Sequence, residues 1–349
     1  MKNRALKIIL NAVIGIVSVA VFVLLFFSLR TDYFPALWYS LAGLVGAYLL
    51  NAIIHELAHV VSGAIVGLKP YSVQILNLFI GKDETGKFRF AFRRSYGELG
   101  STVFMPKTSV KVYEKHAISS LVALSSNLAI LIAQCVIANA STNLVVVSTV
   151  GITFPVTLYL FLINFIPVFD NDGKILYSFL LGGKNLQIAK NYHNALAELT
   201  LGTTPENLNS QYLIMVGDSP YSVGIRYLRY LAYLKNDEEG AIKELMKISD
   251  ISALPSLSED IEKELLFSAI LLGNDKYIKE CEDRVVGLLE KQLSPIDYRI
   301  HASYRIKTGE VEWAKLILNS GIEYCKTYPN KGLALSEEAY MNSIKNQLK

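Results

Sequence analysis

The chain has 349 residues, a net charge of +3 and 52% hydrophobic residues. This apolar fraction argues against an ordinary soluble enzyme, and the small net charge gives no indication of nucleic-acid binding. The three cysteines, Cys135, Cys281 and Cys325, form no C-x-x-C pair, so we expect neither a disulfide framework nor a cysteine-rich metal site. The apolar excess ends at about Phe169, and beyond Lys184 the composition is that of a soluble helical domain.

The chain begins with a short basic segment, which an apolar run from Ile8 to Leu29 follows. The run is too long for the apolar part of a signal peptide, and no small-x-small cleavage site comes after it. We therefore expect a retained first membrane span, which makes residues 1–35 an N-terminal membrane segment.

The second apolar run, residues 37–68, contains the pentapeptide His55–His59, H-E-L-A-H. Each ionisable group at membrane depth costs roughly 2.5–3.5 kcal/mol on insertion scales, so these residues need a task that offsets the cost. Because positions i and i+4 share one helix face, His55 and His59 can bind a single ion, and Glu56 can reach a water beside it. This is the H-E-x-x-H arrangement of zinc hydrolases, in which the glutamate is a general base. A lone buried histidine is more often a hydrogen-bonded core residue, but a chance H-E-x-x-H inside such a run is rare.

A polar region from Lys69 to Lys115 carries nine Lys or Arg residues. By the positive-inside rule it faces the cytoplasm together with the N-terminus, because the loops on the other side carry only Arg30. Residues 87–93 alternate strictly, Ser72–Ile80 is rich in strand-forming residues, and Gly81–Gly86 supplies a turn. We predict a β-hairpin with one apolar face beside the membrane. It is either a self-contained surface hairpin or an edge that pairs with an extended peptide.

Two further spans are predicted, from about Ala117 to Ala138 and from Leu144 to about Phe169. The last span contains Pro155 and reaches Pro167, and both prolines are expected to bend or break it. Residues 170–173, D-N-D-G, follow the last span, and a helix cap and turn is their plainest interpretation.

A second motif, N-x-x-P-x-x-x-x-D-G, is formed by Asn164, Pro167, Asp172 and Gly173. Together with the transmembrane H-E-x-x-H, it resembles the site-2 protease family of intramembrane zinc metalloproteases, because the two motifs occur in the family's order and topology. The resemblance covers about Leu37 to Leu181. It implies a three-span catalytic core to which the first span is an addition.

The resemblance also implies the site residues. Asp172, rather than Asp170, would join His55 and His59 as the ligands of one Zn²⁺ ion per chain. Glu56 would be the catalytic base. Such a site leaves one position open for water, which is typical of catalytic rather than structural zinc.

Two asparagines, Asn164 and Asn127, are predicted to bind substrate. The family's middle span usually carries a G-P-x-x-N signature, of which residues 123–127, A-L-S-S-N, retain only the asparagine. Lys174 stands where the family's last motif often has a second glycine. The difference at residues 123–127 affects the expected packing around the third span and not the metal site.

Beyond Lys184 the apolar spacing is helical and amphipathic. The predicted turns at Asn236, Asn274 and Thr308 are 38 and 34 residues apart, which suits tetratricopeptide-like repeats, while a generic α-helical bundle is nearly as well supported. Because the last span runs inward, we expect this domain in the cytoplasm with a possible protein partner. The three helical hairpins are expected at about 221–248, 263–289 and 296–324.

The sequence thus predicts a four-span α-helical membrane protein: an N-terminal span (1–35), a metalloprotease core (36–183) with a cytoplasmic β-hairpin insert (69–115), and a cytoplasmic helical domain (184–349). It would lie in the cell membrane with both termini cytoplasmic and cleave a transmembrane protein or membrane-associated peptide, with no nucleic-acid partner. Two alternatives stay open. A membrane metal-ion transporter would need a polar path across the bilayer, and a catalytically idle scaffold working through its tail would not need Glu56.

Overall fold

The computed structural model describes residues 34–82, 88–92, 100–167, 171–215, 220–248, 254–291 and 293–348, together with 12–13 and 15–16. It is mostly helical, with a small sheet and three helices that are long and apolar enough to cross a membrane. These features confirm the predicted helical class. The predicted first span lies outside the described residues, apart from the two short pieces. The chain divides into two compact units, of which the first contains α2 to α5 and the sheet, and the second contains α6 to α13.

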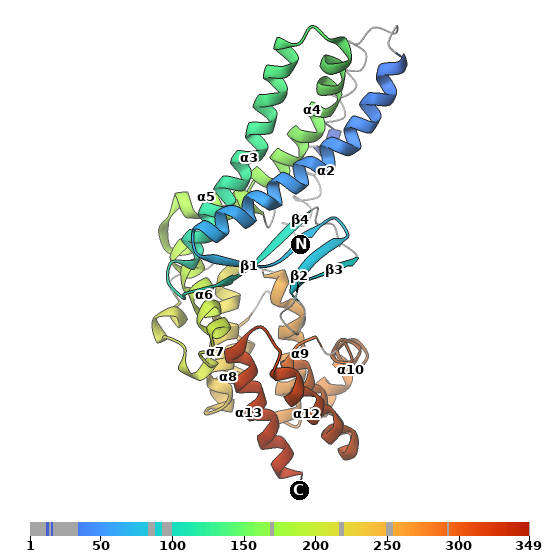
Figure 1. Cartoon of the computed structure of the whole chain (residues 1–349). Coiled ribbons are helices and arrows are strands. Elements are labelled where there is room, and N and C mark those ends of the chain that lie inside the picture. Colours follow the sequence, from blue (N-terminus) through green and yellow to red (C-terminus); the bar gives the residue numbers. More distant parts are fainter. Residues whose placement is uncertain are drawn as a thin grey trace. The chain divides into compact units, whose positions relative to one another are not determined.

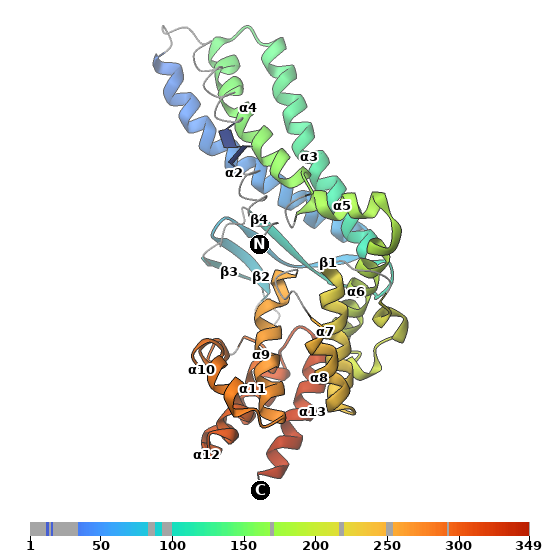
Figure 2. The ribbon, with the colours of Figure 1, turned by 180° about the vertical axis from the view of Figure 1, so that it is seen from behind.

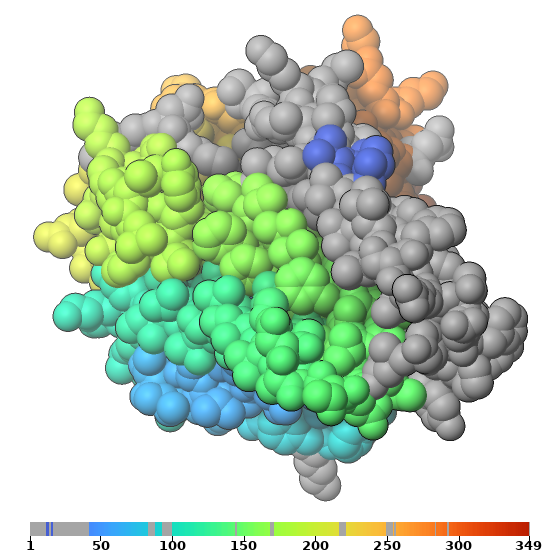
Figure 3. Space-filling model, turned by 90° about the horizontal axis from the view of Figure 1, so that it is seen from above, coloured from blue at the N-terminus to red at the C-terminus, as the bar shows by residue number. Residues whose placement is uncertain are grey.

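Three membrane-length helices form the frame of the first unit: α2 (Phe34–Ile65), α3 (Val112–Ala140) and α4 (Leu144–Phe165). They lie side by side when seen from the front and from behind (Figures 1 and 2), and α3 and α4 are neighbours in the view from above (Figure 3). Large apolar side chains such as Val61 and Ile132 are more than half exposed on these helices. Such surfaces suit contact with lipid, as expected of a membrane protein.

Hydrogen bonds between polar side chains join these helices in their interior. Asn51 Nδ2 donates to Thr157 Oγ1 over 3.1 Å, which links α2 to α4. Gln134 Nε2 donates to Thr153 Oγ1 over 3.2 Å, which links α3 to α4. Polar pairs of this kind commonly hold transmembrane helices together.

The last membrane-length helix is shorter than predicted. α4 continues through Pro155 without a break and ends at Phe165, with Ile166 as its C-cap. The break therefore comes just before Pro167, where the residue preceding a proline disfavours helix. The short helix α5 (Asp172–Leu181) follows.

A four-stranded sheet stands where the alternation predicts a two-stranded hairpin. Its strands are arranged in the order β3-β2-β1-β4, with β1 antiparallel to β2 and β2 antiparallel to β3. β4 therefore lies at one edge, beside β1. The strands are β1 (Leu68–Ile75), β2 (Leu78–Lys82), β3 (Phe88–Phe92) and β4 (Gly100–Pro106).

The predicted strand Ser72–Ile80 is wrong because a turn divides it into β1 and β2. Ile75 pairs with Leu78, so Leu76 and Asn77 form a two-residue loop. Leu76 has a positive φ of 52°, a conformation that costs energy for a leucine and that the flanking strand pairs must enforce. Asparagine is a turn residue, but its apolar neighbours hide that signal in the sequence.

The second unit is a helical domain in which three helix pairs, α7–α8, α9–α10 and α11–α12, follow one another. Side-chain caps fix two of the connecting turns near their predicted positions: Asp237 Oδ1 accepts from Gly240 N, and Asn274 Oδ1 accepts from Tyr277 N. The elements are α6 (Gly183–Leu201), two 3₁₀ turns (Pro205–Asn207 and Ser210–Leu213), α7 (Pro220–Leu234), α8 (Glu238–Met246), α9 (Pro255–Leu271), α10 (Asp275–Leu289), α11 (Pro295–Lys307), α12 (Val311–Cys325) and α13 (Lys331–Gln347).

A buried arginine on α11 connects four helices of this unit. Arg299 is fully buried; its Nη2 donates to Glu264 Oε1 on α9 and its Nε donates to Glu337 Oε2 on α13, each over 2.6 Å. The Tyr230 hydroxyl on α7 donates to Glu264 Oε2 over 2.7 Å. The guanidinium also lies 4.3 Å from the centre of the Phe267 ring.

We expect Arg299→Met to lower the free energy of unfolding by about 3–5 kcal/mol, because it leaves Glu264 and Glu337 buried without a counter-charge. Denaturant unfolding of the whole chain in detergent, followed by helical circular dichroism, measures the change. Arg305→Met on the same helix is the control, since its ion pair with Glu310 is partly exposed and is worth about 1 kcal/mol or less. Equal losses in the two variants would contradict the prediction.

Candidate metal centre

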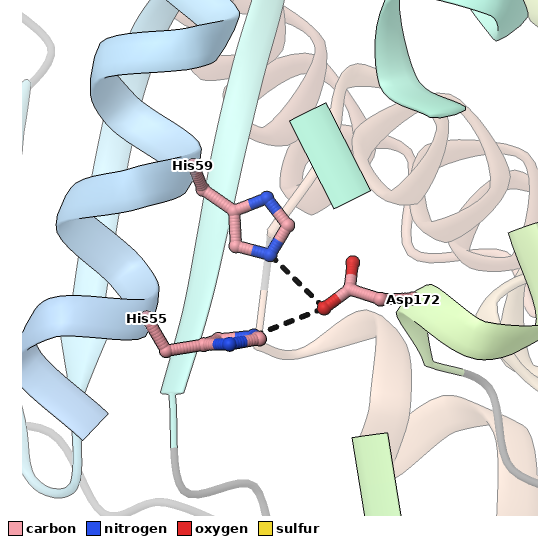
Figure 4. Close-up of side chains that lie close together, drawn as sticks. All are labelled: His55, His59 and Asp172. Carbon is pink, nitrogen blue, oxygen red and sulfur yellow. Dashed lines mark hydrogen bonds and ion pairs between the residues drawn. The ribbon is translucent and has the colours of Figure 1, made fainter. Parts of the chain in front are cut away.

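His55 and His59 lie one turn apart on the same face of α2. His55 is buried and His59 is largely buried, and their ring centroids are 4.9 Å apart with an angle of 83° between the ring planes. The i, i+4 spacing on one helix face brings both Nε2 atoms towards one point. Figure 4 shows the two rings reaching from α2 towards that point.

Asp172 reaches the same point from the other side (Figure 4). It is the first residue of α5, and its Oδ2 accepts hydrogen bonds from His55 Nε2 over 2.9 Å and from His59 Nε2 over 3.1 Å. The three ligand atoms lie within 4.8 Å of one another. The structure therefore brings together the three ligands predicted from the sequence, whereas Asp170 lies outside the described residues.

Asn171 fixes the place where α5 begins. Its Nδ2 donates to the carbonyl oxygens of Ile163 (2.5 Å) and Ile166 (2.9 Å) at the end of α4. Its Oδ1 accepts from Lys174 N over 3.0 Å in the first turn of α5, as an N-cap does. One side chain thus joins two helix ends and orients Asp172. The sequence indicates the cap but not the bond to α4.

Gly173 allows α5 to approach α4 closely. A Cβ at this position would lie 1.9 Å from the carbonyl oxygen of Phe165 and 2.9 Å from that of Asn164. Any side chain would therefore push the start of α5, and Asp172 with it, away from α4. This contact gives a physical reason for the glycine in the second motif.

The two asparagines predicted to bind substrate take different places. Asn164 lies half-buried in the last turn of α4, where its backbone borders Gly173. Asn127 is buried on α3, and its Oδ1 has no hydrogen-bond partner among the described residues. Among the residues that the structure describes, neither side chain makes a hydrogen bond to the three predicted ligands, so both substrate roles stay predictions.

The surroundings of Asp172 favour the ionised form of its carboxyl group. Burial raises the pKa of this carboxyl group, but the hydrogen bonds from His55 and His59 outweigh burial and hold the pKa below its ordinary value. Asp172 is therefore a negatively charged group at neutral pH, opposite two imidazole nitrogens.

The donor set fits a metal ion, and His55, His59 and Asp172 can hold one. Two imidazole nitrogens and one carboxylate oxygen are the ligands of many catalytic zinc sites, and tetrahedral zinc separates such atoms by about 3.3 Å. The observed separations of 2.9 and 3.1 Å are close to that value. The other nitrogen of the second histidine, His59 Nδ1, lies 3.1 Å from Ser119 Oγ on α3. A hydrogen bond there is the usual support of a metal-bound imidazole. No pattern in the sequence distinguishes Ser119 from the other small polar residues of α3.

Glu56 is buried beside the ligands, with 4% of its surface exposed. Its Oε2 accepts a hydrogen bond from Thr102 Oγ1 on β4 over 2.5 Å. Gly100, at the start of β4, lies against the same carboxylate. Sequence reasoning missed both β4 residues, because the alternation around residues 87–93 does not extend to this strand.

A comparison of the chain with protein-family models, with curated protein sequences and with solved structures finds no match. The function is therefore inferred from the chemistry of the site and from the motifs that form it.

Proposed function

We propose that the protein is an intramembrane zinc metalloprotease that cleaves a peptide bond within or next to a transmembrane segment of its substrate. The observation that carries this proposal is the convergence of His55 and His59, which lie on a membrane-length helix, with Asp172 at the start of α5, next to the buried carboxylate of Glu56. Two histidines, one carboxylate and an adjacent glutamate are the parts that metal-dependent hydrolysis needs.

The depth of the site favours a membrane-embedded substrate. The apolar stretch of α2 ends at Ile65, ten residues after His55. Ten residues of helix span about 15 Å, which is half the thickness of a bilayer's hydrocarbon core of about 30 Å. A peptide bond that reaches this depth belongs to a segment that is itself in or at the membrane.

The chemistry divides among a few residues. Held by His55, His59 and Asp172, zinc would supply Lewis-acid chemistry, polarising a carbonyl group and acidifying a water. Glu56 takes the proton of the attacking water and passes it to the leaving amine. Ser119 orients His59 through its second ring nitrogen, and the burial of His55, His59 and Asp172, whose side chains are at most 12% exposed, limits access of bulk water.

The substrate must present an extended peptide bond. In a transmembrane helix the backbone amides are hydrogen-bonded and shielded, so the helix has to unwind locally before the bond is attacked. We expect substrates whose membrane segment is easily unwound near the site. In the proposed topology the charge of the basic loops favours the cytoplasmic side for this site and for both termini.

The metal-ion transporter is the alternative function. It would use the same three ligands but would also need a polar path across the bilayer. Farther along the helices the polar side chains Asn51 and Gln134 bond to threonines of α4, as helix-packing residues do. This packing role does not favour a polar path. In addition, a transporter would have no task for Glu56. A catalytically idle scaffold has no use for this buried glutamate either.

The test uses a doubly tagged single-span membrane protein, reconstituted with the purified protein in vesicles. We expect cleavage when the cytoplasmic half of its span carries Gly-Pro at the depth of the site, and slower cleavage, on the order of tenfold, when Leu-Leu replaces that pair. Glycine and proline weaken a helix by about 1 and 3 kcal/mol.

Mass spectrometry of the fragments locates the cut, and a zinc chelator should stop the reaction until zinc is returned. Zinc flux into the vesicles without any fragment would overturn the protease and support the transporter.

A further inference from the structure

One face of β4 lies against α2. Gly100, Thr102 and Phe104 alternate along the strand and therefore point to the same side. Thr102 bonds to Glu56, and a Cβ on Gly63 would lie 2.4 Å from Phe104 Cε1. Glu56 and Gly63 are about 10 Å apart along the helix, which lies between the rise of about 7 Å from Thr102 to Phe104 and that of about 13 Å from Gly100 to Phe104. The edge strand thus follows α2 at the level of the site.

The contact with Glu56 is close and specific. Thr102 Oγ1 donates to Oε2 over 2.5 Å, at the short end of the range for a hydrogen bond between two oxygens. A Cβ at Gly100 would lie 2.3 Å from Oε1 and 2.8 Å from Cδ. Only a glycine leaves the space that the carboxylate occupies. The Thr102 hydroxyl therefore holds Glu56 Oε2, and Oε1 lies beside the backbone of Gly100.

We propose that Thr102 is a positioning residue for the general base and that β4 supplies this part of the machinery. A glutamate side chain has considerable rotational freedom, and a reacting carboxylate must be fixed within a narrow range of orientations. The Thr102 hydroxyl fixes Oε2, and the glycine at position 100 keeps room for Oε1 to meet the water. This inference rests on the proposed protease function.

A matched set of variants separates positioning from packing. Thr102→Val keeps the shape and the β-branching but loses the hydroxyl, and it should lower kcat by about 10- to 100-fold with KM unchanged, as expected for a lost hydrogen bond to a charged group. Thr102→Ser restores the hydroxyl and should restore most of the rate. Ser101→Ala removes a hydroxyl from the opposite face of β4 and should leave kcat as it is. Bound zinc should stay the same in all three.

A cross-link tests the geometry without any measurement of activity. In a chain whose native cysteines are replaced by alanine, Glu56→Cys and Gly100→Cys should form a disulfide under mild copper–phenanthroline oxidation. The Cβ at position 100 would lie 2.8 Å from Glu56 Cγ, whose place the new sulfur takes. Glu56→Cys with Ser101→Cys is the control and should stay reduced. A specific protease site inserted at residues 83–87 shows whether the two fragments remain joined.

The outcomes keep the two proposals apart. If the wild type does not cleave, or if Glu56→Gln cleaves as fast as the wild type, the protease function fails and this inference fails with it. If cleavage depends on Glu56 but Thr102→Val keeps the wild-type kcat, the inference alone is wrong. Equal losses in Thr102→Val and Thr102→Ser, or no cross-link, overturn it as well. A tenfold loss with rescue by serine supports it.

Discussion

Glu56→Gln is expected to slow peptide-bond cleavage by about 10²- to 10⁴-fold, the usual cost of removing a general base. Glutamine has the shape of glutamate and still accepts a hydrogen bond from Thr102, but it cannot take a proton from water. The variant should therefore fold normally and bind as much zinc as the wild type. Initial rates with the Gly-Pro substrate and metal analysis of the same preparations measure both properties.

The double variant Glu56→Gln with Thr102→Val sharpens this test. If the hydroxyl acts only through the carboxylate, its loss should cost little once the base is gone, because residues that act as a unit are not additive. A double variant much slower than Glu56→Gln would give Thr102 a separate task. Unchanged cleavage by Glu56→Gln alone would exclude it as the general base.

The membrane-length helices and two of the three ligands could be predicted from local patterns. Length and apolar composition define a spanning helix, and the four-residue spacing of His55 and His59 is enough to place both rings on one face. Asp172 is a different case. Asp172 is 117 positions from His55 in the sequence, and no local pattern predicts the contact between them. The family resemblance supplied it.

The rest of the site depends on contacts that a local pattern cannot reveal. Thr102 meets Glu56 across 46 residues, from a strand without clear alternation. Ser119 is one of several small polar residues in its helix, and only packing selects it as the neighbour of His59. The sequence predicts a cap at Asn171, but the bond from Asn171 to the end of α4 depends on where that helix ends. The turn at Leu76 was missed because a strained leucine occupies it.

Asp172→Ala is expected to weaken zinc binding by more than about 100-fold, because even the partners that only support metal ligands are worth 10- to 100-fold. The variant loses one of three protein ligands and the negative charge of the set. Asp170→Ala is the matched control, since it removes the same side chain two residues earlier, and it should bind zinc as the wild type does. Metal analysis after dialysis against a zinc buffer gives the two affinities.

Asn171→Ala should fall between these variants, with zinc binding weakened by about 10- to 100-fold. It leaves all three ligands in place but removes the bonds from α5 to Ile163 and Ile166, so Asp172 loses its fixed position. Asn171→Asp keeps the N-cap acceptor but cannot donate to the two carbonyl groups. It should therefore resemble Asn171→Ala, since the donated bonds hold the two helix ends together. If Asp170→Ala loses zinc while Asp172→Ala keeps it, the third ligand is assigned to the wrong carboxylate.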